Sequence, residues 1–166
     1  MSGTIGEPKI DSRPEQAYVG IRTVTPFKGM SRVIESLSRE VSTWVKERDI
    51  RPAGPPFLRL HVIDMRGEMD LTYGIPVGEA LAGDGRVYAG VLVAGRYASL
   101  VYSGSGIAGN RALIEWVRAN GMDFDRWSTA KGDNFRCRYE SYLTDPKTEP
   151  RKTRWKIEVA IKLADQ

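Results

Sequence analysis

The stretch WKIEVAIKL, Trp155 to Leu163, alternates apolar and polar side chains along its whole length. A period of two residues is typical of a strand in an antiparallel sheet that is covered on one face and polar on the other. A second stretch, MDLTYGIPV (Met69 to Val77), resembles it in a register that aligns Ile75 with Ile161. These two similar strands predict that the chain contains an internal duplication.

Two helical patterns and several further strands surround this pair. Apolar residues recur at intervals of three and four over Ser31 to Arg48 and again over Ala108 to Asn120, where Gly121 is a natural stop. Segments rich in β-branched and aromatic residues predict seven strands. They are Ala17–Val24, Phe57–Asp64, Glu68–Val77, Tyr88–Val93, Tyr97–Tyr102, Phe135–Leu143 and Trp155–Leu163.

The order strand, helix, strand, strand therefore occurs twice, over residues 17–77 and 97–163. We predict an α+β fold in which duplicated repeats form one concave antiparallel sheet, with the helices on its outer face and a central ligand cleft. Repeat one covers about residues 5–77, a glycine-rich linker covers 78–86, and repeat two covers about 87–164. Because each half is small for an independent core, residues 1–166 are predicted to form a single domain.

Composition narrows the class of protein. The chain has 166 residues, 41% hydrophobic and 28% charged, which is typical of a soluble globular domain. No run approaches the roughly 18 apolar residues of a membrane span, and the first residues lack a signal-peptide pattern. The single cysteine, Cys137, and the single histidine favour a reduced cytoplasmic protein without a disulfide, a metal site or a cofactor. Cys137 is predicted to lie in the core.

Three segments then point to a family. They are YESYLTD (Tyr139 to Asp145), WKIE (Trp155 to Glu158) and VAGRYA (Val93 to Ala98). Together with the duplicated order of elements, they resemble the GyrI-like small-molecule-binding family over essentially the whole chain. This domain occurs as the effector-binding half of AraC-type and MerR-type multidrug regulators and as stand-alone proteins. The resemblance implies a pocket at the pseudo-two-fold, lined by aromatic residues around a buried glutamate, that accepts flat or lipophilic cations.

The chain departs from this pattern in two respects. Its two helices are separated by strands, which leaves no room for a helix-turn-helix, so we expect no direct nucleic-acid binding. Arg59 is unusual in a wall that should accept cations, and it leaves the charge of the ligand open.

Glu140 is the predicted charge anchor of the site. If the last hairpin is centred near Glu149, Glu158 lies opposite Glu140, and the two carboxylates would repel unless a cation, a basic side chain or a shared proton compensates them. Tyr142 offers an aromatic face to a bound cation. In the alternative interpretation, both glutamates lie on a solvated face and pair with Arg136, Arg138 or Lys156.

Three further residues complete the predicted ligand-binding set. His61 aligns with Tyr142 between the repeats and is placed at the cleft, where Asp70 can orient it; it can equally be a polar residue satisfied within the sheet. Tyr73 and Tyr102 lie on strands that border the cleft.

These observations predict a stand-alone protein that binds or senses a small lipophilic, cationic or aromatic molecule, linked to transcription regulation or toxin resistance. A first alternative is a hydrolase of strained, cyclopropane-type electrophiles that uses Glu140 and Glu158, because some relatives have that activity. A second is a gyrase-inhibitor-like module whose partner is a topoisomerase or a regulator. The sequence leaves open the identity of the ligand, turnover and the oligomeric state.

Overall fold

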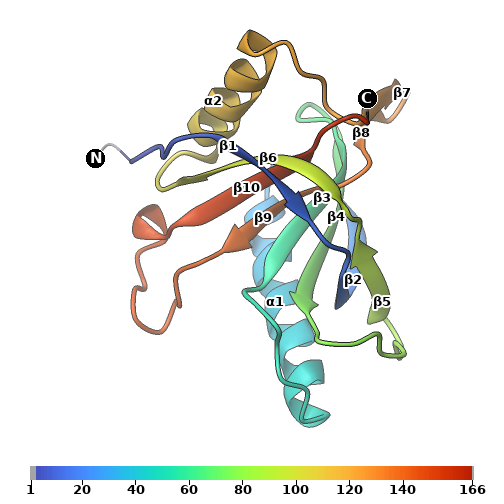
Figure 1. Ribbon diagram of the computed structural model, residues 1–166. Coiled ribbons are helices and arrows are strands. Elements are labelled where there is room, and N and C mark those ends of the chain that lie inside the picture. The colour runs from blue at the N-terminus through green and yellow to red at the C-terminus, as the bar shows by residue number, and fades with distance from the viewer. Residues whose placement is uncertain (1–2, 166) are drawn as a thin grey trace.

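The computed structural model describes residues 3–165, and over this range ten strands form one curled antiparallel sheet with two α-helices (Figure 1). Met1, Ser2 and Gln166, the ends of the predicted domain, lie outside the described residues. The predicted α+β class is confirmed. The strands are β1 (Lys9–Arg13), β2 (Gln16–Pro26), β3 (Phe57–Ile63), β4 (Glu68–Pro76), β5 (Tyr88–Leu92), β6 (Gly95–Tyr102), β7 (Arg126–Thr129), β8 (Gly132–Phe135), β9 (Arg138–Tyr142) and β10 (Ile157–Lys162). The helices are α1 (Met30–Glu47), α2 (Gly106–Ala119) and the short 3-10 helix η1 (Lys152–Arg154).

The order of strands in the sheet reads alike from either edge. From one edge to the other it is β1-β6-β10-β9-β3-β4-β2-β5, and the hairpin of β7 and β8 adds to β3. The strand that precedes each half pairs with the other half, since β1 pairs with β6 and β5 pairs with β2. The chain therefore exchanges one edge strand between its two halves.

Both helices cover the same side of the sheet. The helix α1 packs on β2 and β4 through a stripe that includes Leu37 and Val41, and α2 packs on β6 through Leu113 and Val117. The side chain of Ser105 caps α2 by accepting a hydrogen bond from the backbone N–H of Ala108 at 3.1 Å. This arrangement divides the apolar core on the helix side into two clusters, one beneath each helix.

The opposite, concave side carries an aromatic cluster that the curl of the sheet encloses. Tyr18, Phe57, Tyr97 and Tyr139 are buried there and meet edge to face, with ring centroids 5.1 to 5.9 Å apart. Cys137 is buried in the same cluster, which confirms its predicted place in the core.

The predicted elements differ from the observed ones mainly in the second half. Both helices are found within two residues of their predicted ends. The predicted strand over residues 135–143 is instead two elements, because the chain breaks at Arg136 and Cys137 between β8 and β9. The strands β1 and β7 were not predicted, and neither was β8 apart from Phe135. No helix in residues 3–165 is both long and apolar enough to cross a membrane.

Candidate ligand-binding site

A single row of side chains crosses the middle of the sheet on the helix side. Strand pairing aligns Leu100 of β6, Val159 of β10, Glu140 of β9, Leu58 of β3 and Tyr73 of β4. Four of the five are buried and apolar or aromatic, and Glu140 is the charged member. Because α1 covers β2 and β4 while α2 covers β6, Glu140 lies on the part of the sheet between the two helices.

The carboxyl group of Glu140 is held by a tyrosine hydroxyl. The hydroxyl of Tyr102, on β6, donates a hydrogen bond to Glu140 Oε1. Tyr102 is only 3% exposed and lies beneath α2, whereas Glu140 retains some exposure to water. The contact therefore fixes the position of the carboxyl group.

Aromatic rings continue the site toward the end of β9. The rings of Tyr142 and Tyr73 are stacked, with centroids 6.4 Å apart, and the ring of Trp155 meets Tyr142 edge-on at 6.3 Å. The indole N–H of Trp155 donates to the carbonyl of Glu149 at 2.6 Å, which holds the ring in place. We call Tyr73, Tyr102, Glu140, Tyr142 and Trp155 the helix-side site.

The electrostatics of the helix-side site disfavour an ionised glutamate. Burial raises the pKa of Glu140 above its ordinary value, while the Tyr102 hydroxyl, the charge of Arg138 and the amide of Asn110 act in the opposite direction. Within residues 3–165, no basic nitrogen lies within 4.0 Å of the Glu140 carboxylate. Burial likewise raises the pKa of Tyr73 to about 12, so this phenol is neutral. The site can supply a proton, or it can accept a positive group.

The expected pairing of Glu140 with Glu158 is wrong. In the hairpin of β9 and β10, Glu140 lies opposite Val159, and Glu158 lies opposite Ser141. This shift of one residue sends the two carboxylates to opposite faces of the sheet, because successive side chains alternate between faces.

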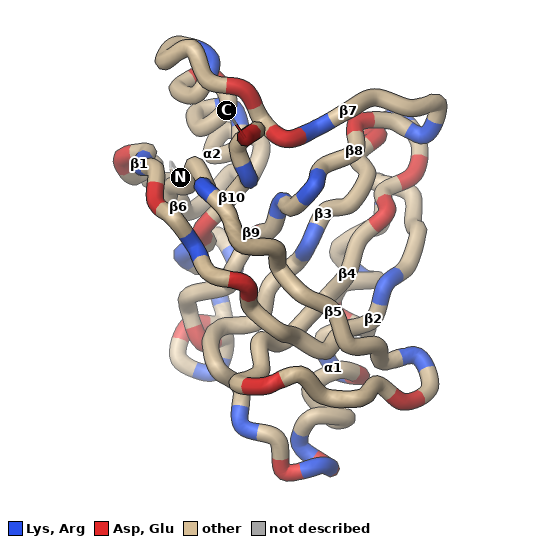
Figure 2. Tube along the Cα trace, turned by 45° about the vertical axis from the view of Figure 1, so that its right-hand side comes forward, with Lys and Arg blue, Asp and Glu red and all other residues tan. Residues whose placement is uncertain are grey.

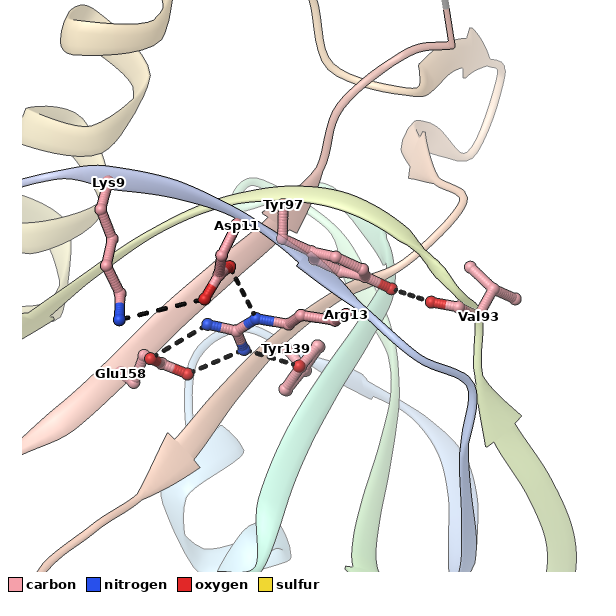
Figure 3. Close-up of polar contacts among 7 residues, drawn as sticks. All are labelled: Lys9, Asp11, Arg13, Val93, Tyr97, Tyr139 and Glu158. Carbon is pink, nitrogen blue, oxygen red and sulfur yellow. Dashed lines mark hydrogen bonds and ion pairs between the residues drawn. The ribbon is translucent and has the colours of Figure 1, made fainter.

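Glu158 instead belongs to a polar cluster on the concave side (Figure 3). Arg13 Nη1 and Nη2 donate to its two carboxylate oxygens at 2.9 and 3.1 Å, and Nη1 also donates to the hydroxyl of Tyr139 at 2.8 Å. Arg13 Nε donates to Asp11 at 3.2 Å. The charge of Glu158 is therefore compensated within the fold.

His61 also faces the concave side. Its Nε2 forms a hydrogen bond with the Thr72 hydroxyl at 2.8 Å, and burial together with the charges of Arg59 and Arg22 lowers its pKa to about 3. Asp70 binds Arg22 through two hydrogen bonds of 2.9 Å and does not orient His61. His61 is thus a neutral residue satisfied within the sheet. The structure brings together four of the six predicted residues, Tyr73, Tyr102, Glu140 and Tyr142, and separates His61 and Glu158 from them.

The alternative in which basic neighbours pair with both glutamates is not found either. Arg136 lies 3.7 Å from Asp125, and Arg138 donates to Asn110. Arg59 spans the concave side, donating to the carbonyls of Val91 and Arg136 at 2.8 and 3.0 Å. Arg59 is therefore no part of the helix-side site.

Comparison with known proteins decides the family. The family of GyrI-like small molecule binding domains matches residues 6–164. The chain belongs to the GyrI-like family. No curated protein matches the sequence significantly.

Solved structures share the GyrI-like fold at low sequence identity. The C-terminal domain of EcmrR is 17% identical with a TM-score of 0.68, and the match covers 97% of this chain and 99% of that domain. A hydrolase from Listeria innocua is 12% identical with a TM-score of 0.61, covering 95% and 92% of the two chains. SAV2435 bound to tetraphenylphosphonium is 12% identical with a TM-score of 0.56, covering 95% and 94%. This chain spans 58% of the EcmrR chain seen in its complex with DNA.

Two surface hollows of this GyrI-like domain lie away from Glu140. One, of about 430 Å³, is at the end of α2 and includes Arg118, Phe124 and Trp127. The other, of about 460 Å³, lies over α1 beside Trp44 and Arg48. The central cleft predicted on the concave face, opposite the helices, stays a prediction, and Glu140 lies on the other, helix side of the sheet.

Sequence reasoning missed two residues beside Glu140. Arg138 was considered only as a surface partner, yet it is 7% exposed and lies on the helix side. Asn110, which holds it from α2, was not considered. The sequence could have indicated Arg138, because residues two apart on a strand, such as Arg138 and Glu140 on β9, lie on the same face of the sheet.

Proposed function

We propose that this protein binds a small lipophilic molecule with an aromatic body and a positively charged group at the helix-side site. The observation that carries the proposal is Glu140, the charged residue in an apolar row, whose carboxylate has no cation within 4.0 Å in residues 3–165. A ligand cation beside Glu140 would compensate the charge that burial disfavours.

The aromatic residues supply the rest of the interaction. Tyr142 and Trp155 offer ring faces and edges next to the carboxyl group, and a cation over such a ring gains about 0.5 to 2 kcal/mol, more when it is desolvated. The complex of SAV2435 with tetraphenylphosphonium supports a lipophilic cation as the class of ligand. A lipophilic cation therefore suits both the acidic group and the aromatic rings of the helix-side site.

The proposed role is that of a cytoplasmic sensor or sequestering protein. EcmrR forms a complex with DNA, and this chain resembles its C-terminal domain over nearly its full length. In a regulatory role, ligand binding at this domain would be coupled to a DNA-binding part. Protection from a toxic ligand would require binding alone.

The experiment is a calorimetric titration with tetraphenylphosphonium and with neutral tetraphenylmethane-type analogues of similar size. We expect saturable binding of the cation that weakens at least tenfold in Glu140→Gln, a loss of about 1.4 kcal/mol. Glu158→Gln is the matched control, because it removes the same charge from the opposite face. Its affinity for the cation should stay within about twofold of the unmodified protein.

Two results would overturn the proposal. One is the absence of binding by tetraphenylphosphonium and by other lipophilic cations titrated in the same way. The other is binding that Glu140→Gln and Glu158→Gln weaken equally, because the effect would then come from overall charge and not from the helix-side site.

Hydrolysis is the second candidate, and Glu140 itself favours it. A carboxyl group with a raised pKa that contacts a phenol, as Glu140 contacts Tyr102, can protonate a strained electrophile while water attacks it. Relatives by fold include a hydrolase from Listeria innocua. The separation from Glu158 leaves Glu140 as the acid of such a reaction. Product formation from a cyclopropane-bearing substrate that Glu140→Gln abolishes would establish this activity, and unchanged substrate after prolonged incubation would exclude it.

A further inference from the structure

A buried arginine accompanies Glu140 on β9. Arg138 lies two residues before Glu140 on the same face, opposite Ile161, and is 7% exposed. Its Nη2 donates to Asn110 Oδ1 of α2 at 2.6 Å, and its guanidinium lies over the ring of Phe135 at 4.7 Å. Arg138 is thus held between the sheet and α2, next to the helix-side site.

This guanidinium lacks a negative partner. Within residues 3–165, no carboxylate oxygen lies within 4.0 Å of it, and its Nε is buried without a hydrogen-bond partner. The nearby Asp133 pairs with Arg126 at 3.1 Å instead. Arg13, on the concave side, shows the contrast, since both of its terminal nitrogens bind Glu158.

Burying a charge that only a neutral amide contacts is costly, and the cost falls when an opposite charge comes close. Residues two apart on a strand have Cα atoms about 6.6 Å apart. Glu140 and Arg138 therefore place one negative and one positive group side by side, and within residues 3–165 the two form no direct ion pair within 4.0 Å. A molecule that lies between them can form an ion pair with each of the two side chains.

We propose that the ligand of the helix-side site is amphoteric: an aromatic molecule with a cationic group for Glu140 and a carboxylate, or a similar anionic acceptor, for Arg138. This inference rests on the proposed function and specifies its ligand class. In this proposal, Arg138 makes the site select a zwitterion over a simple cation. Asn110 contacts Arg138 in the absence of ligand, and the anionic group of the ligand joins or replaces this contact.

Three probes with the same aromatic skeleton measure separately how the ammonium group and the carboxylate of the ligand contribute to binding. They are 3-(2-naphthyl)alanine, a zwitterion; 2-(2-naphthyl)ethylamine, which lacks the carboxylate; and 3-(2-naphthyl)propionate, which lacks the ammonium group. Calorimetric titration at pH 7 should show that the unmodified protein binds the zwitterion at least about tenfold more tightly than either of the other two.

Substitutions then test Arg138 itself. Asn110→Asp places a carboxylate beside the guanidinium with almost no change in shape, so the zwitterion should lose its advantage over the amine. Arg138→Met should have the same effect, because it removes the guanidinium and leaves an apolar side chain of similar size. Arg136→Met is the matched control, since Arg136 is exposed and pairs with Asp125, and the tenfold preference should persist in it.

The outcomes distinguish this inference from the proposed function. Equal affinity for the amine and the zwitterion in the unmodified protein, or a preference that survives Asn110→Asp, overturns the role of Arg138 while Glu140-dependent cation binding still stands. Binding of none of the three probes and of no lipophilic cation overturns both proposals.

Discussion

At the scale of single residues, the buried carboxyl group of Glu140 lowers the stability of the ligand-free protein and provides a group that can bind a cation. Its folded-state pKa is raised above the ordinary value, so the folded protein binds this proton more tightly than the unfolded chain does. This proton contributes to the free energy of unfolding, and the contribution is fully present at low pH. It is lost as the pH rises from the pKa of the unfolded chain, near 4.5, through the higher pKa of the folded protein. Above the folded-state pKa, the ionised carboxylate lowers the stability of the protein, and a bound cation would offset this loss.

Glu140→Gln should therefore stabilise the ligand-free protein at pH 8, because the neutral amide carries no charge for burial to disfavour. The gain should shrink toward pH 4, where the unmodified residue is protonated. Urea unfolding at several pH values measures it. Glu158→Gln should instead destabilise the protein by about 1 to 3 kcal/mol, because it leaves Arg13 without its partner. Equal effects of the two substitutions would contradict the contrast between the two faces.

How far single residues could be predicted depended on register. Glu140 and Tyr142 followed from the family resemblance and are brought together with Tyr73 and Tyr102. The pairing of Glu140 with Glu158 did not follow. The alternation of β10 places Glu158 opposite the helices, as the structure has it, and an offset of one residue in the last hairpin moves Glu140 to the helix side. The long connection between β9 and β10 carries no short turn motif that would fix this offset.

At the scale of elements, α2 reaches the site through a glycine. A Cβ atom at Gly109 would lie 2.5 Å from Cγ of the Tyr102 ring, closer than carbon atoms approach. The absence of a side chain at this position lets α2 lie directly on Tyr102, whose hydroxyl contacts Glu140. The glycine thus connects the packing of a helix to the geometry of the site.

Gly109→Ala should test this connection. Alanine gains about 1 kcal/mol of helix propensity, but the clash must move α2 or the Tyr102 ring. We expect a lower melting temperature and at least a severalfold loss of cation affinity. Gly106→Ala is the graded control. Its Cβ would lie 3.2 Å from the Tyr102 hydroxyl and 3.9 Å from Cζ of that ring, so the substitution should have a smaller effect. A more stable Gly109→Ala protein with unchanged affinity would contradict the proposed contact.

Elements with a strong apolar period could be predicted, and polar ones could not. The buried stripes of α1 and α2 gave both helices within two residues of their ends. The strand β1, KIDSR, and the exposed β7, RWST, have no such period. Their structure comes from pairing with β6 and β8, which no local pattern records.

At the scale of the whole molecule, the two halves share their edges and their centre. Strands β1 and β5 are exchanged between the halves, and the halves meet where Leu58 of β3 lies opposite Glu140 of β9. The helix-side site sits on this junction. Acidic and basic residues are interspersed over the described trace (Figure 2), so the distinctive charge feature of the molecule is this pair of groups at its centre.

We propose that the two halves fold as one unit. Residues 1–86 and 87–166, produced separately, should each lack cooperative unfolding, because each would lose a paired edge strand and expose the central strand of its sheet. Mixing them in equal amounts should restore the circular dichroism spectrum and cation binding. A half that unfolds cooperatively by itself would contradict this expectation.

The most direct measurement is a pH titration of the Glu140 side-chain carboxyl carbon by ¹³C NMR, with and without saturating 2-(2-naphthyl)ethylamine. We expect a midpoint above 4.5 in the free protein, which falls when the cationic probe is bound because the positive charge favours the carboxylate. A midpoint at or below 4.5 in the free protein, or one that does not move at saturation, would contradict the claim that Glu140 is the group that a ligand cation neutralises.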